Sequence, residues 1–161
     1  MMQQLVEERM HQDNFAILDI EYIRISKTHC CVRKLYMLAK NGYDELEMEF
    51  YPCVRFEDLK KQYQRSFRFC RNYIHKLEYY PEPYVPECST AKNKINTFII
   101  DNGINLILYK GGKIERDFCE GELFIPSYNI ECFPELEKVQ SHDPRIEVNC
   151  YYKQLVELGY F

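Results

Sequence analysis

Acidic side chains and one histidine are spaced along the chain in a way that suits divalent metal binding. Asp19 and Glu21 lie in FAILDIEYI, Glu115 follows YKGG, and His142 and Glu147 lie in SHDPRIEV. Because alternate side chains of a strand point to the same face, Asp19 and Glu21 would present two carboxylates side by side. Mg²⁺ and Mn²⁺ prefer such oxygen ligands, and two ions can orient a water and polarise a phosphate. The pattern predicts a two-metal phosphodiesterase site.

The elements that must position these residues follow from the spacing of apolar side chains. Strands are expected where β-branched and aromatic residues recur between turns, and helices where apolar residues recur every three or four positions. In chain order these are strands 15–23, 31–39 and 46–51, helices 56–77 and 89–101, strand 104–109, a helix from 113 to 120, strand 127–130 and helix 144–158. Asn41-Gly42 favours a hairpin between the second and third strands. Asp143 before Pro144 fits an N-cap followed by proline at the first helical position.

The composition favours one folded domain over all 161 residues. Hydrophobic residues make up 46% of the chain and aromatic residues 15%, which is enough for a core and excludes a disordered chain. Residues 1–13 are expected to form a flexible or helical N-terminal extension. The 21 basic and 25 acidic residues give a net charge of -4, which argues against binding nucleic acid by bulk charge. Any phosphate ligand must therefore be held locally.

Eight cysteines occur in a chain whose polar first residues show no secretory signal pattern. No segment is long and apolar enough to span a bilayer. The sequence therefore predicts an intracellular protein, cytoplasmic or nuclear, with no membrane partner and with thiols that are reduced or bound to metal.

Motifs at the two ends of this pattern resemble those of the DEDDh exonucleases of the ribonuclease H-like superfamily. The first strand carries D-x-E as Asp19-Ile20-Glu21, and the last helix begins with His, four residues and an acid, from His142 to Glu147. The middle motif, an acid five residues after a polar turn residue, corresponds to Glu115 after Lys110. The resemblance covers nearly the whole chain. It implies an α/β fold with a mixed sheet of about five strands, three antiparallel first and parallel ones added, flanked by helices.

The chain departs from the family's pattern at three of these positions. Members usually have Asp where this chain has Glu115 and Glu147, and Asn where it has Lys110. A longer carboxylate reaches a metal only if its backbone lies about one methylene further away. Asp117 and Asp101 are therefore alternatives for the middle acid, and Asp143 is the alternative for the last one.

The function implied by the resemblance is metal-dependent 3′-to-5′ exonuclease activity on single-stranded RNA or DNA ends. Four acids would hold two Mg²⁺ or Mn²⁺ ions: Asp19, Glu21, Glu115 and Glu147. His142 would act as general base toward the attacking water. The alternative is a catalytically inactive nucleic-acid-binding or protein-interaction module of the same fold, with a structural zinc as an option. The sequence identifies no protein partner.

Soft ligands form two candidate zinc groups. The first comprises Cys53, Cys70, His75 and Cys88. Thiolates and imidazole suit zinc, but this spacing fits no zinc-finger pattern, so buried free cysteines are the competing interpretation. The second group, Cys132 with His142 and Cys150, would resemble the Maelstrom branch of the superfamily, in which zinc ligands accompany loss of the acidic set.

Basic and aromatic residues are interleaved in the predicted helix 56–77. They are Arg65, Arg68, Arg71 and Lys76, with Phe67, Phe69 and Tyr73. Such a surface can guide a single strand by phosphate contacts and base stacking. Lys110 is a further candidate phosphate contact. The alternative is that these residues form ordinary helix surface and core.

Overall fold

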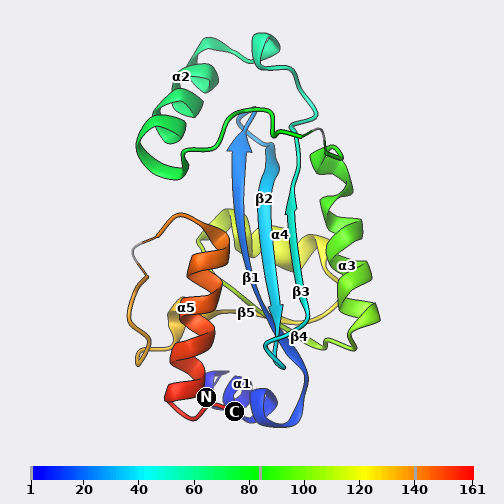
Figure 1. Cartoon of the computed structure of the whole chain (residues 1–161), viewed down its shortest axis with the longest axis vertical. Helices are drawn as coiled ribbons and strands as arrows, with labels where there is room; N and C mark the ends of the chain where they lie inside the picture. The colour runs from blue at the N-terminus through cyan, green and yellow to red at the C-terminus, as the bar shows by residue number, and fades with distance from the viewer. Residues whose placement is uncertain (1, 84, 140) are drawn as a thin grey trace.

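Five strands form one mixed sheet at the centre of the molecule (Figure 1). The computed structural model describes residues 2–83, 85–139 and 141–161. The strands are β1 (Phe15–Arg24), β2 (Cys30–Ala39), β3 (Glu45–Glu49), β4 (Leu106–Tyr109) and β5 (Ser127–Asn129), in the order β3-β2-β1-β4-β5. The first three pair antiparallel, and β4 and β5 are added parallel to β1. The predicted α/β class and mixed sheet are confirmed.

Helices cover both faces of this sheet and one of its ends (Figure 1). They are α1 (Met2–Gln12), α2 (Lys61–Cys70), α3 (Ala91–Asp101), α4 (Lys113–Glu122) and α5 (Pro144–Glu157). One core cluster joins the sheet to α3 and α4, and the other joins it to α1 and α5. The helix α2 lies across the end of the sheet to which β1 points, opposite α1 (Figure 1).

The alternation of side chains in β1 decides which core each residue enters. Ala16 and Leu18 pack in the cluster with α3 and α4, whereas Phe15 and Ile17 pack in the cluster with α1 and α5. Side chains two residues apart share a face, so Asp19 continues the row of Phe15 and Ile17. The first acid therefore faces α5.

The final helix α5 forms as its sequence predicts. The Asp143 side chain accepts a hydrogen bond from the Arg145 backbone N–H at 2.9 Å, and Pro144 is the first helical residue. Its buried side chains recur every three or four positions, namely Pro144, Glu147, Val148, Tyr151 and Leu155. Glu147 thus belongs to the stripe that packs on the sheet, although it carries a charge.

The predicted long helix over 56–77 is wrong as one element. A 3₁₀ turn spans Phe56–Asp58, and the backbone is then extended at Leu59 and Lys60, with ψ of 145° and 148°. The helix α2 begins only at Lys61 and runs into a π-helical turn over Arg71–His75. Leu59 and Phe67 pack in a third cluster at the end of the sheet. The extended link places Leu59 in that cluster, which a continuous helix would not do.

Residues 1–13, expected to be an extension, include α1. The side chains of Val6 and Met10 are buried in the same cluster as those of α5. The Lys40 ammonium donates to the carbonyl of Met10 at the C-terminal end of α1, with Nζ 2.6 Å from the oxygen. The helix therefore completes one face of the sheet.

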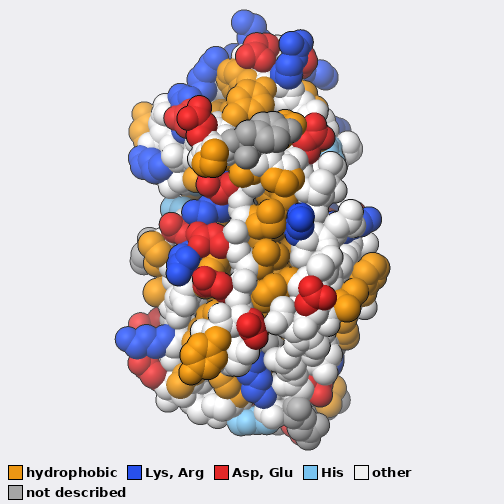
Figure 2. Space-filling view, turned by 45° about the vertical axis from the view of Figure 1, so that its right-hand side comes forward, with side chains coloured by type: hydrophobic (Ala, Val, Ile, Leu, Met, Phe, Trp, Pro, Cys, Tyr) orange, Lys and Arg blue, Asp and Glu red, His pale blue; other side chains and the backbone are white. Residues whose placement is uncertain are grey.

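Charged side chains of both signs are spread over the surface. Figure 2 shows acidic and basic side chains intermixed on one face, around a band of hydrophobic side chains. The face shown carries no continuous positive field for a polyanion. Among the described residues, no helix combines the length and the apolar character that crossing a membrane requires.

Candidate metal centre

Three of the predicted acids converge between β1 and α5. Asp19, Glu21 and Glu147 each offer a carboxylate oxygen, and these oxygens all lie within 4.8 Å of one another. Asp19 is 4% exposed and Glu147 is 1% exposed, although acids are almost never buried without a partner. Oxygen ligands about 2.0 to 2.6 Å from one cation lie at most about 5 Å apart, so the group has the dimensions of a metal site.

Lys110 supplies positive charge to this group. It directly follows β4, and its backbone N–H donates to the Leu18 carbonyl at 3.1 Å, which places it beside Asp19 on the neighbouring strand. The Lys110 ammonium donates to Glu147, with Nζ 2.8 Å from Oε1. One ammonium thus faces three carboxylates.

Two oxygens of the group lack a hydrogen-bond partner among the described residues. They are Asp19 Oδ2 and Glu147 Oε2, and both are buried. The other Asp19 oxygen, Oδ1, accepts from the Ile20 backbone N–H at 2.9 Å. Buried polar atoms without partners are rare because they lose their hydrogen bonds to water and gain none in the protein. A cation between these carboxylates would satisfy both oxygens.

Burial and mutual repulsion shift the acids toward their protonated forms. The pKa of Asp19 is raised well above its usual range, first by burial and then by its contact with Glu147, although Lys110 opposes the shift. Burial and the charge of Glu147 raise the pKa of Glu21 to about 7. A divalent cation reverses the sign of the local field and favours the ionised forms.

We expect the metal-free protein to lose stability as the pH rises from about 4.5 to about 7. The folded-state pKa of Glu21 is about 7 against 4.5 for an unperturbed Glu, so folding favours the protonated form. This stabilisation is complete below the unfolded-state pKa and is lost as the pH rises through the folded-state pKa, with a loss of up to about 3 kcal/mol. Urea unfolding with EDTA at pH 5 and pH 8 measures it.

Glu21→Gln should reduce this pH dependence, and Glu120→Gln, on the exposed face of α4, is its matched control. Asp19 retains a raised pKa in the Gln variant, so part of the pH dependence remains. Equal losses of stability in the wild type and in Glu21→Gln would contradict the role of Glu21.

The fourth predicted acid, Glu115, lies outside the group of three. Its Oε1 accepts from the Tyr22 hydroxyl at 2.9 Å, and its Oε2 accepts from the Gly112 backbone N–H at 2.8 Å. The second contact is half of a capping box at the start of α4. Both Glu115 oxygens therefore hold the helix start, while its charge contributes to the raised pKa of Glu21.

The alternative acids do not supply the fourth carboxylate that Glu115 fails to provide to the group. Asp117 pairs with Lys113 on the surface of α4, with Oδ2 2.7 Å from Nζ. Asp101 is exposed at the end of α3. Asp143 caps α5 and lies 3.9 Å from the Lys34 ammonium, near enough to raise the pKa of Glu21. Of these two acids on the last helix, Glu147 and not Asp143 thus belongs to the group of three carboxylates.

Gly111→Ala should disrupt the turn that holds Glu115. Gly111 has φ +141°, and a Cβ built there would overlap the side chain of Glu115. Strain and displacement of the carboxylate should lower the free energy of unfolding by about 2 kcal/mol or more, measured by urea unfolding. Gly112→Ala is the matched control, since its Cβ would meet nothing within 4 Å. Equal losses in the two variants would contradict the close contact.

His142 lies on the surface directly before the N-cap Asp143. The pKa of His75 is lowered, first by burial and then by the nearby Arg33 and His142. No hydrogen bond joins the His142 ring to an acid among the described residues. A general base acts on the attacking water and need not contact the metal ligands, so the catalytic role of His142 stays a prediction.

The first predicted zinc group is not brought together. Cys53 and Cys88 line one cavity with His29 and Cys31, whereas Cys70 and His75 line another with Tyr22. The sequence pattern did not point to His29 and Cys31. His29 directly precedes β2 and Cys31 is its second residue, and a spacing of two is the signal for side chains on one side of an extended chain.

The second predicted zinc group does not form either among the described residues. Cys132 and Cys150 are exposed, and no metal-ligand group contains them or His142. The zinc alternative that would have used His142 as a ligand therefore has no geometric support.

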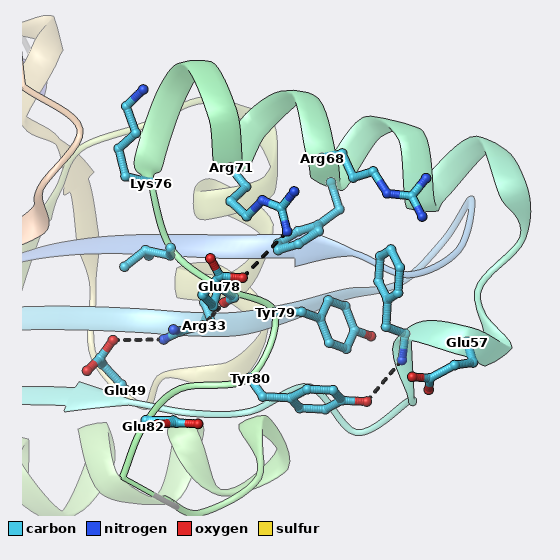
Figure 3. A pocket seen from close by; sticks show the side chains of 13 residues that line it. Arg33, Glu49, Glu57, Arg68, Arg71, Lys76, Glu78, Tyr79, Tyr80 and Glu82 are labelled. Carbon is cyan, nitrogen blue, oxygen red and sulfur yellow. Dashed lines mark hydrogen bonds and ion pairs between the residues drawn. The ribbon is translucent and has the colours of Figure 1, made fainter.

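A cavity lies under α2, and none of the three acids lines it. It encloses about 600 Å³, and Figure 3 shows Arg68 and Arg71 above Tyr79 and Tyr80. Its charged lining residues are four basic and four acidic: Arg33, Arg68, Arg71 and Lys76, with Glu49, Glu57, Glu78 and Glu82. These charges balance formally, so the cavity does not attract a polyanion by net charge.

The basic residues of α2 and of the π-helical turn after it are partly used within the fold. Arg71, in that turn, pairs with Glu78 at 3.5 Å (Figure 3). Arg68, in α2, lies over the Phe56 ring, 5.2 Å from its centroid. Arg65 is exposed. Phe67, expected to offer a stacking surface, is 5% exposed and belongs to the core cluster at the end of the sheet. The predicted interface loses Phe67 but keeps exposed basic side chains.

The fold and site define an α/β protein with three converging carboxylates on one face of its central sheet. The chain matches no protein-family model, and no curated protein sequence is significantly similar to it. Its function is therefore inferred from the geometry of its own residues.

Proposed function

We propose that the chain is a divalent-metal-dependent phosphodiesterase that acts as a 3′-to-5′ exonuclease on single-stranded RNA or DNA. The observation that carries the proposal is the convergence of Asp19, Glu21 and Glu147 within 4.8 Å, with two buried oxygens lacking partners among the described residues. Holding three ionised acids, two of them buried, against a single ammonium is unfavourable unless further positive charge balances them or protons neutralise them. Mg²⁺ or Mn²⁺ supplies that charge and prefers these ligands.

The proposed roles follow from where each side chain lies. Asp19 holds the metal with Glu21 and Glu147. When bound, two such ions polarise the scissile phosphate and lower the pKa of the attacking water. His142, on the surface beside the start of α5, takes the proton of that water. The sheet order β3-β2-β1-β4-β5 supports the proposal, because a mixed sheet of this kind is what a ribonuclease H-like fold implies.

An exposed aromatic pair on and beside α2 supports a single-stranded substrate. Phe69 and Tyr73 are 58% and 72% exposed, and their ring centroids lie 5.1 Å apart. Bases stack on such rings regardless of sequence, with about 1 to 3 kcal/mol per base. Cys70, between them in the sequence, lies near enough to Glu21 for the acid to raise its pKa. The pair therefore belongs to a segment that passes close to the proposed metal ligands.

A second candidate function is favoured by Lys110. Its ammonium, 2.8 Å from Glu147 Oε1, supplies from within the chain part of the charge that a metal would bring. Because the Lys110 ammonium is part of the chain itself, its charge would keep the fold stable without a metal ion. The chain would then be a catalytically inactive nucleic-acid-binding or protein-interaction module.

Wild-type protein and single-stranded RNA and DNA labelled at the 3′ end test these proposals. The exonuclease proposal expects release of labelled mononucleotide with Mn²⁺ or Mg²⁺, none with EDTA, and slower release when the 3′ end is blocked. Absence of hydrolysis with either metal on both substrates would rule out the enzyme. Retention of the intact oligonucleotide in a binding assay would then support the inactive module.

A further inference from the structure

A second group of candidate metal ligands lies on the opposite face of the sheet from the acids. We propose that His29, Cys31, Cys53 and Cys88 form a structural zinc site. Cys31 and Cys88 pack in the cluster with α3 and α4, whereas Asp19 faces α5. The two centres therefore do not share residues, and this proposal is independent of the exonuclease proposal.

The distances among three of these ligands fit one zinc ion. His29 Nε2 lies 4.0 Å from both Cys31 Sγ and Cys53 Sγ, and the two sulfurs are 3.3 Å apart. Zn–S bonds of about 2.3 Å and Zn–N bonds of about 2.0 Å place tetrahedral ligand atoms about 3.5 to 4 Å from one another. The observed separations lie close to that range, so small side-chain adjustments would complete the geometry.

Cys88 is the proposed fourth ligand beside the group that His29, Cys31 and Cys53 form. Its side chain is buried and lines one cavity of about 310 Å³ together with those three residues. A fourth soft ligand at this place would complete the tetrahedral set that a structural zinc ion requires.

The backbone brings these residues together from three segments. His29 directly precedes β2, Cys31 is the second residue of that strand, Cys53 follows β3, and Cys88 begins the 3₁₀ turn before α3. The Cys88 N–H donates to the Tyr51 carbonyl at 3.0 Å, and the Tyr51 N–H donates to the Pro86 carbonyl at 3.3 Å. This short ladder fixes the Cys88 segment beside the Cys53 segment before any metal binds.

The ligand chemistry favours zinc over a disulfide or a hard cation. A disulfide requires sulfurs about 2.05 Å apart, whereas Cys31 and Cys53 are 3.3 Å apart and both are free thiols. Mg²⁺ and Ca²⁺ prefer oxygen ligands, whereas thiolates and imidazole are typical of zinc. Four protein ligands leave no open position for a substrate, which indicates a structural role.

The proposed zinc would fix both ends of the excursion that carries α2. Cys53 and Cys88 border residues 54–87, and this excursion contains the exposed ring pair Phe69 and Tyr73. A metal link between its two ends and the start of β2 reduces the freedom of the unfolded chain. Zinc would therefore hold α2 in place over the end of the sheet.

Metal analysis and Co²⁺ substitution of the purified full chain test the site. We expect about one tightly bound zinc per chain, and with Co²⁺ the thiolate-to-cobalt absorption of a three-thiolate tetrahedral site. Cys53→Ser and Cys88→Ser should each reduce that absorption and weaken zinc binding by about 100-fold or more. Cys132→Ser, which removes an exposed thiol outside the cavity, is the matched control and should bind normally. Asp19→Asn should also keep its zinc.

Several outcomes would overturn the site. They are a wild-type zinc ratio near zero after refolding with zinc, a cobalt spectrum without thiolate absorption, or a mass that shows a disulfide between Cys31 and Cys53. Unchanged thiolate absorption in Cys88→Ser would remove Cys88 as the fourth ligand. If either serine variant does not fold, the wild-type cobalt spectrum still decides between a thiolate site and none.

Discussion

Asp19→Asn is expected to abolish Mn²⁺-dependent release of mononucleotides while leaving the protein folded. Asp19 is a buried acid of the group, and its Oδ2, which lacks a hydrogen-bond partner among the described residues, is available to a cation. An amide retains the shape but not the charge, so metal binding and rate should both fall, the rate by about a thousandfold or more. Single-turnover hydrolysis of a 3′-labelled oligonucleotide and calorimetric Mn²⁺ titration measure the two effects.

The stability of Asp19→Asn separates a lost ligand from a lost fold. Because burial and Glu147 raise the pKa of Asp19, the metal-free fold already favours an uncharged side chain there. The variant should therefore unfold in EDTA at the same urea concentration as the wild type or a higher one, but should gain no stability from Mn²⁺. Asp117→Asn, at an exposed ion pair on α4, is the control and should retain activity. A wild-type rate in Asp19→Asn would refute the metal centre.

Lys110→Met is expected to destabilise the metal-free protein by about 2 to 3 kcal/mol at pH 8. Glu147 is 1% exposed, and its carboxylate pairs with the Lys110 ammonium at 2.8 Å. Removing one member of a buried pair leaves the other charge without compensation. The loss should be smaller at pH 5, where carboxylates take up protons, and Mn²⁺ should restore stability at pH 8. Urea unfolding at both pH values, with EDTA or Mn²⁺, measures these effects.

The same variant distinguishes the two candidate functions. In a metal-dependent enzyme the ammonium competes with a cation for Glu147, so Lys110→Met should bind Mn²⁺ more tightly than the wild type. In an inactive module Mn²⁺ should restore nothing. Lys113→Met, which breaks an exposed pair with Asp117, is the control and should change stability by no more than about 0.5 kcal/mol. Equal effects at the two lysines would mean that the Lys110 pair is not buried in solution.

Local chemistry made most elements of the fold predictable. The strands follow β-branched and aromatic runs, Asn41 accepts hydrogen bonds from the backbone N–H groups of Tyr43 and Asp44 in the expected hairpin turn, and Asp143 caps α5. The stretch 56–77 is the exception, because its apolar spacing is helical throughout. Only packing at the end of the sheet, where Leu59 joins Phe67, accounts for the extended link before Lys61.

Some residues of the candidate metal centre could likewise be predicted from local patterns, and others could not. Alternation within one strand indicates that Asp19 and Glu21 lie side by side, because residues two apart in a strand share a face. The helix cap likewise indicates Glu147 near the start of α5. Neither pattern reveals that Lys110 pairs with Glu147, or that Glu115 bonds to Tyr22 and Gly112, since these contacts depend on how separate elements pack.

Local sequence patterns thus specify the α/β element order and two carboxylates on one strand, whereas the mixed sheet is expected from the family resemblance. Long-range packing selects which acids meet, and it joins Cys53 and Cys88 to His29 and Cys31 instead of to Cys70 and His75. The predicted and the unpredicted features differ in how far apart in the sequence the interacting residues lie. Strand alternation and helix caps act over a few residues, whereas ligands from separate segments meet only after the sheet register and the helix packing fix their positions.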